Sequence, residues 1–203
     1  MVKIQFTSGC PNQCQYCYEP KEMEYYDPKI PIGEKMVQIS DMNFLSNPNC
    51  KTILRRLEHR NKSYELICGI DYRILLKDTE LALLLKKANF VKIRWAWDYS
   101  FASGQKTHQG VLKIFKEVGY KPESLSIFIL VNWKIPYVDC VKKLDLLKIW
   151  NVKVNDCCFD GGYKKVYNNE SPMFWKLEDI KRFRKMCRKH NQMVLFKIDP
   201  EIK

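Results

Sequence analysis

The sequence predicts an α/β protein in which six βα units surround a parallel sheet, curved into an open, partial barrel. Three observations predict this fold. Short apolar runs recur six times, segments of helical period separate them, and two of the runs alternate apolar with polar residues. With 203 residues, 46% of them hydrophobic and 13% aromatic, the chain can build the substantial core of one domain.

The predicted strands are short runs of apolar, β-branched or aromatic residues. Their regular spacing is typical of repeated βα units. They span residues 2–6, 36–40, 64–68, 91–97, 125–131 and 152–155.

Helices are predicted between these runs from their start and stop signals. The start signals are Asn47-Pro48, Asp78, Ser103-Gly104 and Pro136. Gly119 is placed as the glycine that ends a helix. The first connection, residues 17–35, contains three prolines and one glycine, so we expect a loop or a stunted helix there.

The end of the chain departs from the βα rhythm. An irregular, aromatic segment follows the sixth run, then a basic helix from about 177 to 191, then an apolar stretch over 193–198. We therefore expect a core over residues 1–160 and a short helical and strand extension over 161–203, packed on the same domain.

Alternation within two strands predicts a polar interior. Residues 91, 93, 95 and 97 are apolar, whereas Lys92, Arg94 and Asp98 share the other face with an alanine. Lys153 and Asn155 repeat the pattern in the sixth run. Since the apolar face must meet the helices, the polar face points inward, which suits an open barrel that holds a polar ligand.

The net charge of +12 favours an anionic partner such as nucleic acid or a phosphorylated metabolite, although lysine-rich surfaces also serve solubility alone. The basic segment near residue 180 has the same two interpretations: a phosphate-contacting surface or a solvated barrel helix. We expect a cytoplasmic protein without a membrane segment, since no apolar run is long enough to span a bilayer.

Three of the nine cysteines lie close together near the start of the chain. In a reducing compartment such a group indicates metal binding rather than disulfides. The other six are expected to be small buried hydrophobes: Cys50, Cys68, Cys140, Cys157, Cys158 and Cys187. Cys157 and Cys158, at the sixth strand end, could alternatively supply a thiol on the substrate side.

The clustered cysteines form a motif directly after the first strand. Residues 7–18 read TSGCPNQCQYCY, so that three and then two residues separate Cys10, Cys14 and Cys17. Three thiolates on a compact loop can ligate three irons of a [4Fe–4S] cubane and leave the fourth iron to an external chelator. The neighbouring Gly9 would let the loop wrap closely around inorganic sulfur.

This spacing, at the end of a first strand and with the aromatic Tyr16 before the third cysteine, resembles the signature of the radical S-adenosylmethionine (SAM) superfamily. The resemblance implies a partial (β/α)6, TIM-like barrel and a [4Fe–4S] cluster whose ligands, and catalytic residues, are Cys10, Cys14 and Cys17. It implies SAM as the second cofactor. SAM would be cleaved reductively to methionine and a 5′-deoxyadenosyl radical that abstracts hydrogen from a polar or anionic substrate. It also implies an electron donor such as flavodoxin or ferredoxin.

A weaker resemblance follows the strand ends. Residues 40–48 read SDMNFLSNP, which is similar to the D-x-N-F-L-x-x-P pattern of several radical SAM groups. The resemblance implies that Asp41 binds the SAM amino group, because a carboxylate opposite an ammonium is the required chemistry. Tyr16 would offer its backbone to the adenine. The remaining SAM-binding or substrate-binding candidates are Asn43, Asp71, Arg73, Asp98, Val131 and Asn132.

Alternatives remain open at this stage. Asp71 and Arg73 could form an ordinary ion pair at a helix start. The three cysteines could belong to a zinc site, but no partner pair follows at finger-like spacing, and the three histidines, His59, His108 and His190, are isolated. A nucleic-acid-binding module with a structural metal is the alternative from another class, and a regulator that binds SAM without cleaving it is a third.

Overall fold

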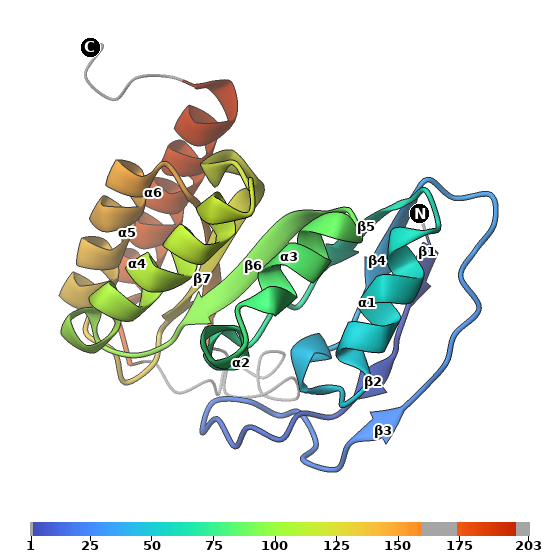
Figure 1. The fold of residues 1–203 in the computed structure, drawn as a ribbon. Coiled ribbons are helices and arrows are strands. Elements are labelled where there is room, and N and C mark those ends of the chain that lie inside the picture. Colours follow the sequence, from blue (N-terminus) through green and yellow to red (C-terminus); the bar gives the residue numbers. More distant parts are fainter. Residues whose placement is uncertain (1, 160–173, 198–203) are drawn as a thin grey trace.

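The computed structural model describes residues 2–159 and 174–197, and its main sheet has six strands in the order β1-β4-β5-β6-β7-β8 (Figure 1). Every neighbouring pair is parallel. The strands are β1 (Val2–Ile4), β4 (Met36–Ile39), β5 (Ser63–Leu66), β6 (Phe90–Trp97), β7 (Leu125–Val131) and β8 (Lys153–Cys158). The α/β class and all six strand positions are confirmed, while the sheet is open, with β1 and β8 at its edges.

Helices follow the strands and cover one face of the sheet. Figure 1 shows α1, α3, α4 and α5 side by side along it. Short 3-10 turns at Phe44–Ser46 and Pro122–Ser124 complete the connections. The helices are α1 (Cys50–Glu58), α2 (Tyr72–Lys77), α3 (Glu80–Lys87), α4 (Phe101–Glu117), α5 (Tyr137–Trp150) and α6 (Leu177–Phe196).

The first crossover has no helix, as predicted. Residues 5–35 are all described, and they contain only β2 (Thr7–Ser8) and β3 (Glu24–Tyr25), which pair antiparallel. Figure 1 shows β2 and β3 at the same end of the sheet as α2. The prolines in this segment exclude a long helix, so the chain forms a loop along the carboxyl edge of the strands.

Helix α4 begins earlier than its glycine suggested. Ser100 caps it by accepting a hydrogen bond from the amide of Ser103, so the predicted start at Ser103-Gly104 is wrong by one turn. Gly104 lies within the helix, and a Cβ there would stand 2.1 Å from the indole nitrogen of Trp97, which explains why this position is glycine. Gly119 ends the helix region with φ +86°, as predicted.

The core lies between the sheet and the helices. Ile93, Trp95 and Trp97 of β6 are fully buried, and the indole of Trp95 donates to His108 of α4 at 3.1 Å. Lys92 and Arg94 lie on the opposite face, where both pair with Glu65 of β5. The predicted division between an apolar helix side and a polar inner side is therefore confirmed.

Helix α6 closes the β8 edge. The side-chain amide of Asn191 accepts from the backbone N–H of Val154 at 2.9 Å and donates to its carbonyl at 2.7 Å. The strand expected over residues 193–198 is wrong for 193–196, because the buried stripe of α6 continues to Val194 at helical spacing. Residue 198 and the expected boundary at residue 160 lie outside the described residues.

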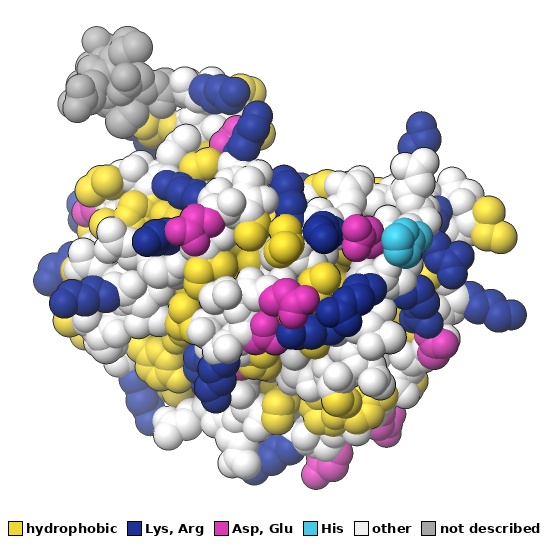
Figure 2. Space-filling view, in the orientation of Figure 1, with side chains coloured by type: hydrophobic (Ala, Val, Ile, Leu, Met, Phe, Trp, Pro, Cys, Tyr) yellow, Lys and Arg dark blue, Asp and Glu magenta, His cyan; other side chains and the backbone are white. Residues whose placement is uncertain are grey.

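Surface charge is dispersed on the helix side of the molecule. Figure 2 shows Lys and Arg side chains spread over this face, with Asp and Glu between them. Some of these charges pair, as Lys51 does with Asp78 and Glu80 at 2.6 Å. None of the helices in the described part of the chain has both the length and the apolar character needed to cross a membrane.

Candidate functional site

A cavity of about 520 Å³ lies at the carboxyl ends of the strands. One wall is the loop of the cysteine motif, and the other walls are the ends of β5 to β8 and the start of α2. This is the edge at which parallel sheets place ligands. Among the residues that line it are Cys10, Asn12, Cys14, Tyr16, Cys17, Asn43, Cys68, Asp71, Arg73, Ala96, Asp98, Phe128, Leu130 and Cys157.

Backbone hydrogen bonds fold the cysteine loop into a compact turn. The amide of Cys10 donates to the carbonyl of Pro20 at 2.8 Å, and the amide of Cys17 donates to the carbonyl of Cys14 at 3.0 Å. Gly9 enters the loop with φ +75°, and a Cβ there would stand 2.0 Å from the Glu22 carbonyl oxygen. Only glycine therefore fits where the loop folds back on itself.

The three cysteines fit the ligand set of an iron–sulfur cluster. All three are free thiols and all three line the cavity. Burial raises the pKa of Cys17, and the neighbouring Cys14 and Cys10 raise it further, so a bound cation would favour its thiolate form. Among the described residues, no three His, Cys, Asp or Glu side chains are grouped to hold one metal ion. A cubane instead gives each thiolate its own iron.

Asn43 connects the cysteine loop to the strand ends. Its side-chain amide lies within hydrogen-bonding reach of the Cys10 sulfur at 3.6 Å and of an Asp71 oxygen at 3.5 Å. Its own carbonyl oxygen is buried and has no hydrogen-bond partner among the described residues. A buried acceptor without a donor beside a cavity is a place where a ligand could donate a hydrogen bond.

Asp71 and Arg73 form a tight pair at the mouth of α2. Asp71 caps the helix by accepting from the Arg73 amide at 3.0 Å, and the guanidinium donates to both carboxylate oxygens at 2.8 and 2.7 Å. Burial would raise the pKa of Asp71, but these bonds and one from Asn12 outweigh it, and the pKa is lowered. Asp71 and Arg73 thus form the ion pair at a helix start that was considered as the alternative. Both side chains also line the cavity.

Tyr16 reaches across the cavity to Asp98. Its hydroxyl donates to the Asp98 carboxylate, and its ring packs edge-on against Trp133 at 6.0 Å between centroids. Burial raises the pKa of Asp98, and burial and the adjacent carboxylate raise that of Tyr16. The ammonium of Lys143, buried behind this site, donates to the carbonyl of Trp97 at 3.0 Å and partly offsets the Asp98 shift. Nothing in the sequence indicated Lys143, because a lysine on a helix is normally exposed to solvent.

Asp41, which was expected to bind the SAM amino group, is not among the residues that line the cavity. The side chain is fully buried and accepts a hydrogen bond from the amide of Phe6 at 2.8 Å. Burial raises its pKa to about 6. The following 3-10 turn carries Asn43, not Asp41, to the cavity.

Val131 and Asn132 are also absent from the cavity lining. Val131 is fully buried and stands on the helix side of β7, and Leu130 takes the cavity side. Asn132 accepts from the amides of Phe174 and Trp175 at 2.9 and 3.1 Å, which ties the start of the α6 region to the end of β7.

Only some of the scattered cysteines are buried. Cys50, Cys140 and Cys187 are buried as expected, whereas Cys68 and Cys158 are partly buried and Cys157 is exposed, so the expectation of burial is wrong for Cys157. Cys68 and Cys157 line the cavity. Burial raises the pKa of Cys157 to about 12, so this thiol stays protonated. His108 and His190 pack in the interior, and His59 is exposed.

No protein-family model matches the chain, and no curated protein matches it either.

Proposed function

We propose that the chain is a radical SAM enzyme and that its open sheet is the partial (β/α)6 barrel of such an enzyme. One observation carries the proposal. Cys10, Cys14 and Cys17, spaced as in the radical SAM signature, line one cavity with Asp71, Arg73 and Asp98 at the carboxyl edge of a parallel sheet. A cluster in this loop would supply the electron that cleaves SAM to methionine and a 5′-deoxyadenosyl radical.

The chain's own residues would bind and orient SAM. The Arg73 guanidinium keeps donors beyond those given to Asp71 and is suited to the SAM carboxylate. The side-chain carbonyl oxygen of Asn43, unpaired among the described residues, and the carboxylate of Asp98 would accept hydrogen bonds from the SAM amino group and the ribose hydroxyls. Asp41 has no part in this proposal.

The remaining cavity wall would receive the substrate. Phe128 and Leu130 of β7 provide an apolar floor, and the protonated thiol of Cys157 stands beside them. The first crossover lacks a helix, and its cysteine loop lies at the carboxyl end of the strands, where it lines the same cavity. The substrate is proposed to be polar or anionic, and the electron donor a small protein such as flavodoxin or ferredoxin.

Anaerobic reconstitution tests the proposal. The wild-type chain should bind about four irons and four sulfides, and it should release 5′-deoxyadenosine when reduced with dithionite in the presence of SAM. Cys14→Ala should lose iron, whereas Cys140→Ala, a buried thiol away from the cavity, should keep it. Well-formed clusters that yield no deoxyadenosine would remove the radical chemistry and leave a SAM-binding regulator.

One observation favours the nucleic-acid-binding alternative. The exposed side of α6 carries a dense group of cations, which includes Lys181, Arg182, Lys185, Arg188 and Lys189. If this helix defines the function, Cys14→Ala should bind RNA as the wild type does, and the purified chain should contain zinc rather than iron.

A further inference from the structure

A second polar layer lies on the inner face of the sheet, one layer of side chains away from the cavity. Arg94 of β6 is in register with Ser126 of β7, which is in register with Lys153 of β8. Residues in register on parallel strands point to the same face, about 4.8 Å from their neighbours. The short Ser126 side chain therefore forms a gap between two long cationic ones.

Positive charge is in excess in this layer. Glu65 pairs with Arg94 and, at 3.5 Å, with Lys92, and Glu123 is a second carboxylate that acts on Lys153. The side chain of Lys153 has neither an ion pair nor a hydrogen bond within the described part of the chain. Three cations thus face two carboxylates in this layer. Burial lowers the pKa of Lys153, Lys92 and Arg94 lower it further, and Glu123 and Glu65 act in the opposite direction without reversing the shift.

The groups around the gap can all donate hydrogen bonds. The side-chain amide of Asn155 donates to the Ser126 oxygen at 3.1 Å, so the hydroxyl proton of Ser126 is left for another acceptor. The Lys153 ammonium has three N–H groups, and the Arg94 guanidinium retains donors beyond those given to Glu65 and the Leu66 carbonyl. Ammonium, guanidinium and hydroxyl together match an oxyanion.

We propose that Arg94, Ser126 and Lys153 form a binding site for a compact oxyanion, the phosphate group of a small phosphorylated molecule. The three donors stand in register on neighbouring strands, and the Arg94 guanidinium would use the donors that it does not give to Glu65 and Leu66. A nucleic-acid backbone would instead need cations in succession along a surface, as on the exposed side of α6.

The position of the site relative to the cavity indicates where the rest of a phosphorylated ligand would lie. Ala96 and Phe128, two residues further along their strands, line the cavity, and two residues span about 6.6 Å. A phosphate held by Lys153 would leave the body of the molecule near the cavity floor. That this molecule is the substrate rests on the proposed function; the oxyanion site itself does not.

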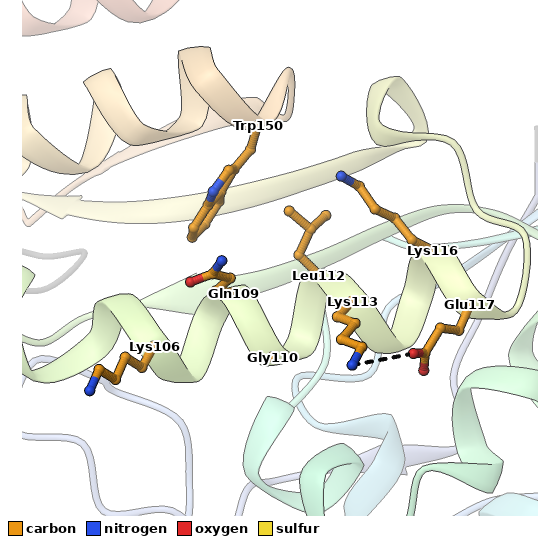
Figure 3. Close-up of a pocket in the computed structure, with 8 residues that line it drawn as sticks. All are labelled: Lys106, Gln109, Gly110, Leu112, Lys113, Lys116, Glu117 and Trp150. Carbon is orange, nitrogen blue, oxygen red and sulfur yellow. Dashed lines mark ion pairs between the residues drawn. The ribbon is translucent and has the colours of Figure 1, made fainter.

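A second hollow with lysines serves as the comparison. It lies outside the sheet, between α4 and Trp150 of α5, and it is lined by Lys106, Lys113 and Lys116 (Figure 3). In Figure 3 the three lysines point in different directions, and Lys113 pairs with Glu117 at 3.8 Å. The lysines there do not converge on a single gap.

Calorimetric titration of the full chain with inorganic phosphate, at constant ionic strength and without cluster or SAM, tests the proposal. The wild type should bind one phosphate saturably. Lys153→Met should weaken binding about tenfold or more, and Ser126→Ala should weaken it severalfold, because a charged and a neutral hydrogen bond are lost. Lys116→Met should bind as the wild type does.

Three outcomes would overturn the site: no saturable phosphate binding by the wild type, equal losses in Lys153→Met and Lys116→Met, or tight binding of an oligonucleotide without binding of phosphate. Thermal melting without phosphate checks that each variant folds, and Ser126→Ala keeps the test valid if Lys153→Met does not fold. A chain that binds phosphate but releases no deoxyadenosine would keep this site and lose the proposed function.

Discussion

The side-chain amide of Asn43 lies 3.6 Å from the sulfur of Cys10. Hydrogen bonds to cysteine sulfur withdraw electron density and raise the reduction potential of a cluster held by that sulfur. The hydrogen bond from Asn43 is therefore expected to raise the reduction potential of the proposed cluster.

We expect Asn43→Ala to lower the cluster's reduction potential, and Asn43→Asp to lower it further because the carboxylate adds a negative charge beside the sulfur. A redox titration followed by electron paramagnetic resonance would measure both shifts. Asn49→Ala, at an exposed position, is the control and should leave the potential unchanged. An unchanged potential in Asn43→Asp would show that this amide does not act on the centre.

Gly9→Ala should destabilise the chain and reduce iron retention. The left-handed conformation costs a non-glycine residue about 1–2 kcal/mol, and the added Cβ would collide with the Glu22 carbonyl. Gly33→Ala, in the same crossover but with open space around it, should have little effect on either quantity. Urea unfolding and iron analysis give the two readouts; equal behaviour of the variants would contradict the loop geometry.

Two glycines of α4 should respond to alanine in opposite directions. Gly104→Ala should destabilise the fold by about 1–3 kcal/mol, because its Cβ would overlap the buried Trp97 ring. Gly110→Ala should stabilise it by about 0.5–1 kcal/mol, since nothing lies within 4 Å and alanine favours helix. Denaturant midpoints measure both, and a stabilised Gly104→Ala would show that α4 packs differently on β6.

Asp41 should make stability fall as the pH rises. Burial raises its pKa from 3.8 to about 6, so between these values the folded chain holds more protons than the unfolded chain. This stabilisation is complete below pH 3.8 and is lost as the pH passes 6. In Asp41→Asn, the free energy of unfolding relative to the wild type should therefore rise by up to about 3 kcal/mol between pH 4 and pH 7. A pH-independent difference between the two chains would show that Asp41 does not titrate in this window.

The sequence predicted those features that depend on local pattern. The strands and the cysteine loop are each encoded within a few consecutive residues, and β6 reveals its two faces because charged residues alternate with tryptophans. Strand β7 is almost uniformly apolar, so its pattern could not show that Leu130 rather than Val131 faces the cavity. The burial of Asp41 was not readable either, since the direction of its side chain after β4 depends on the tertiary contact with the Phe6 amide.

The contact between Asn191 and Val154 has a consequence for assembly. An edge strand usually offers its outward amides and carbonyls to any extended chain that approaches, which is how sheets add strands from other molecules. Here one carboxamide occupies both groups of Val154 near the amino end of that edge. A newly made chain in which α6 has not yet docked therefore exposes β8 to pairing with other chains. Once α6 has docked, Asn191 occupies the N–H and C=O of Val154 and another strand cannot pair there.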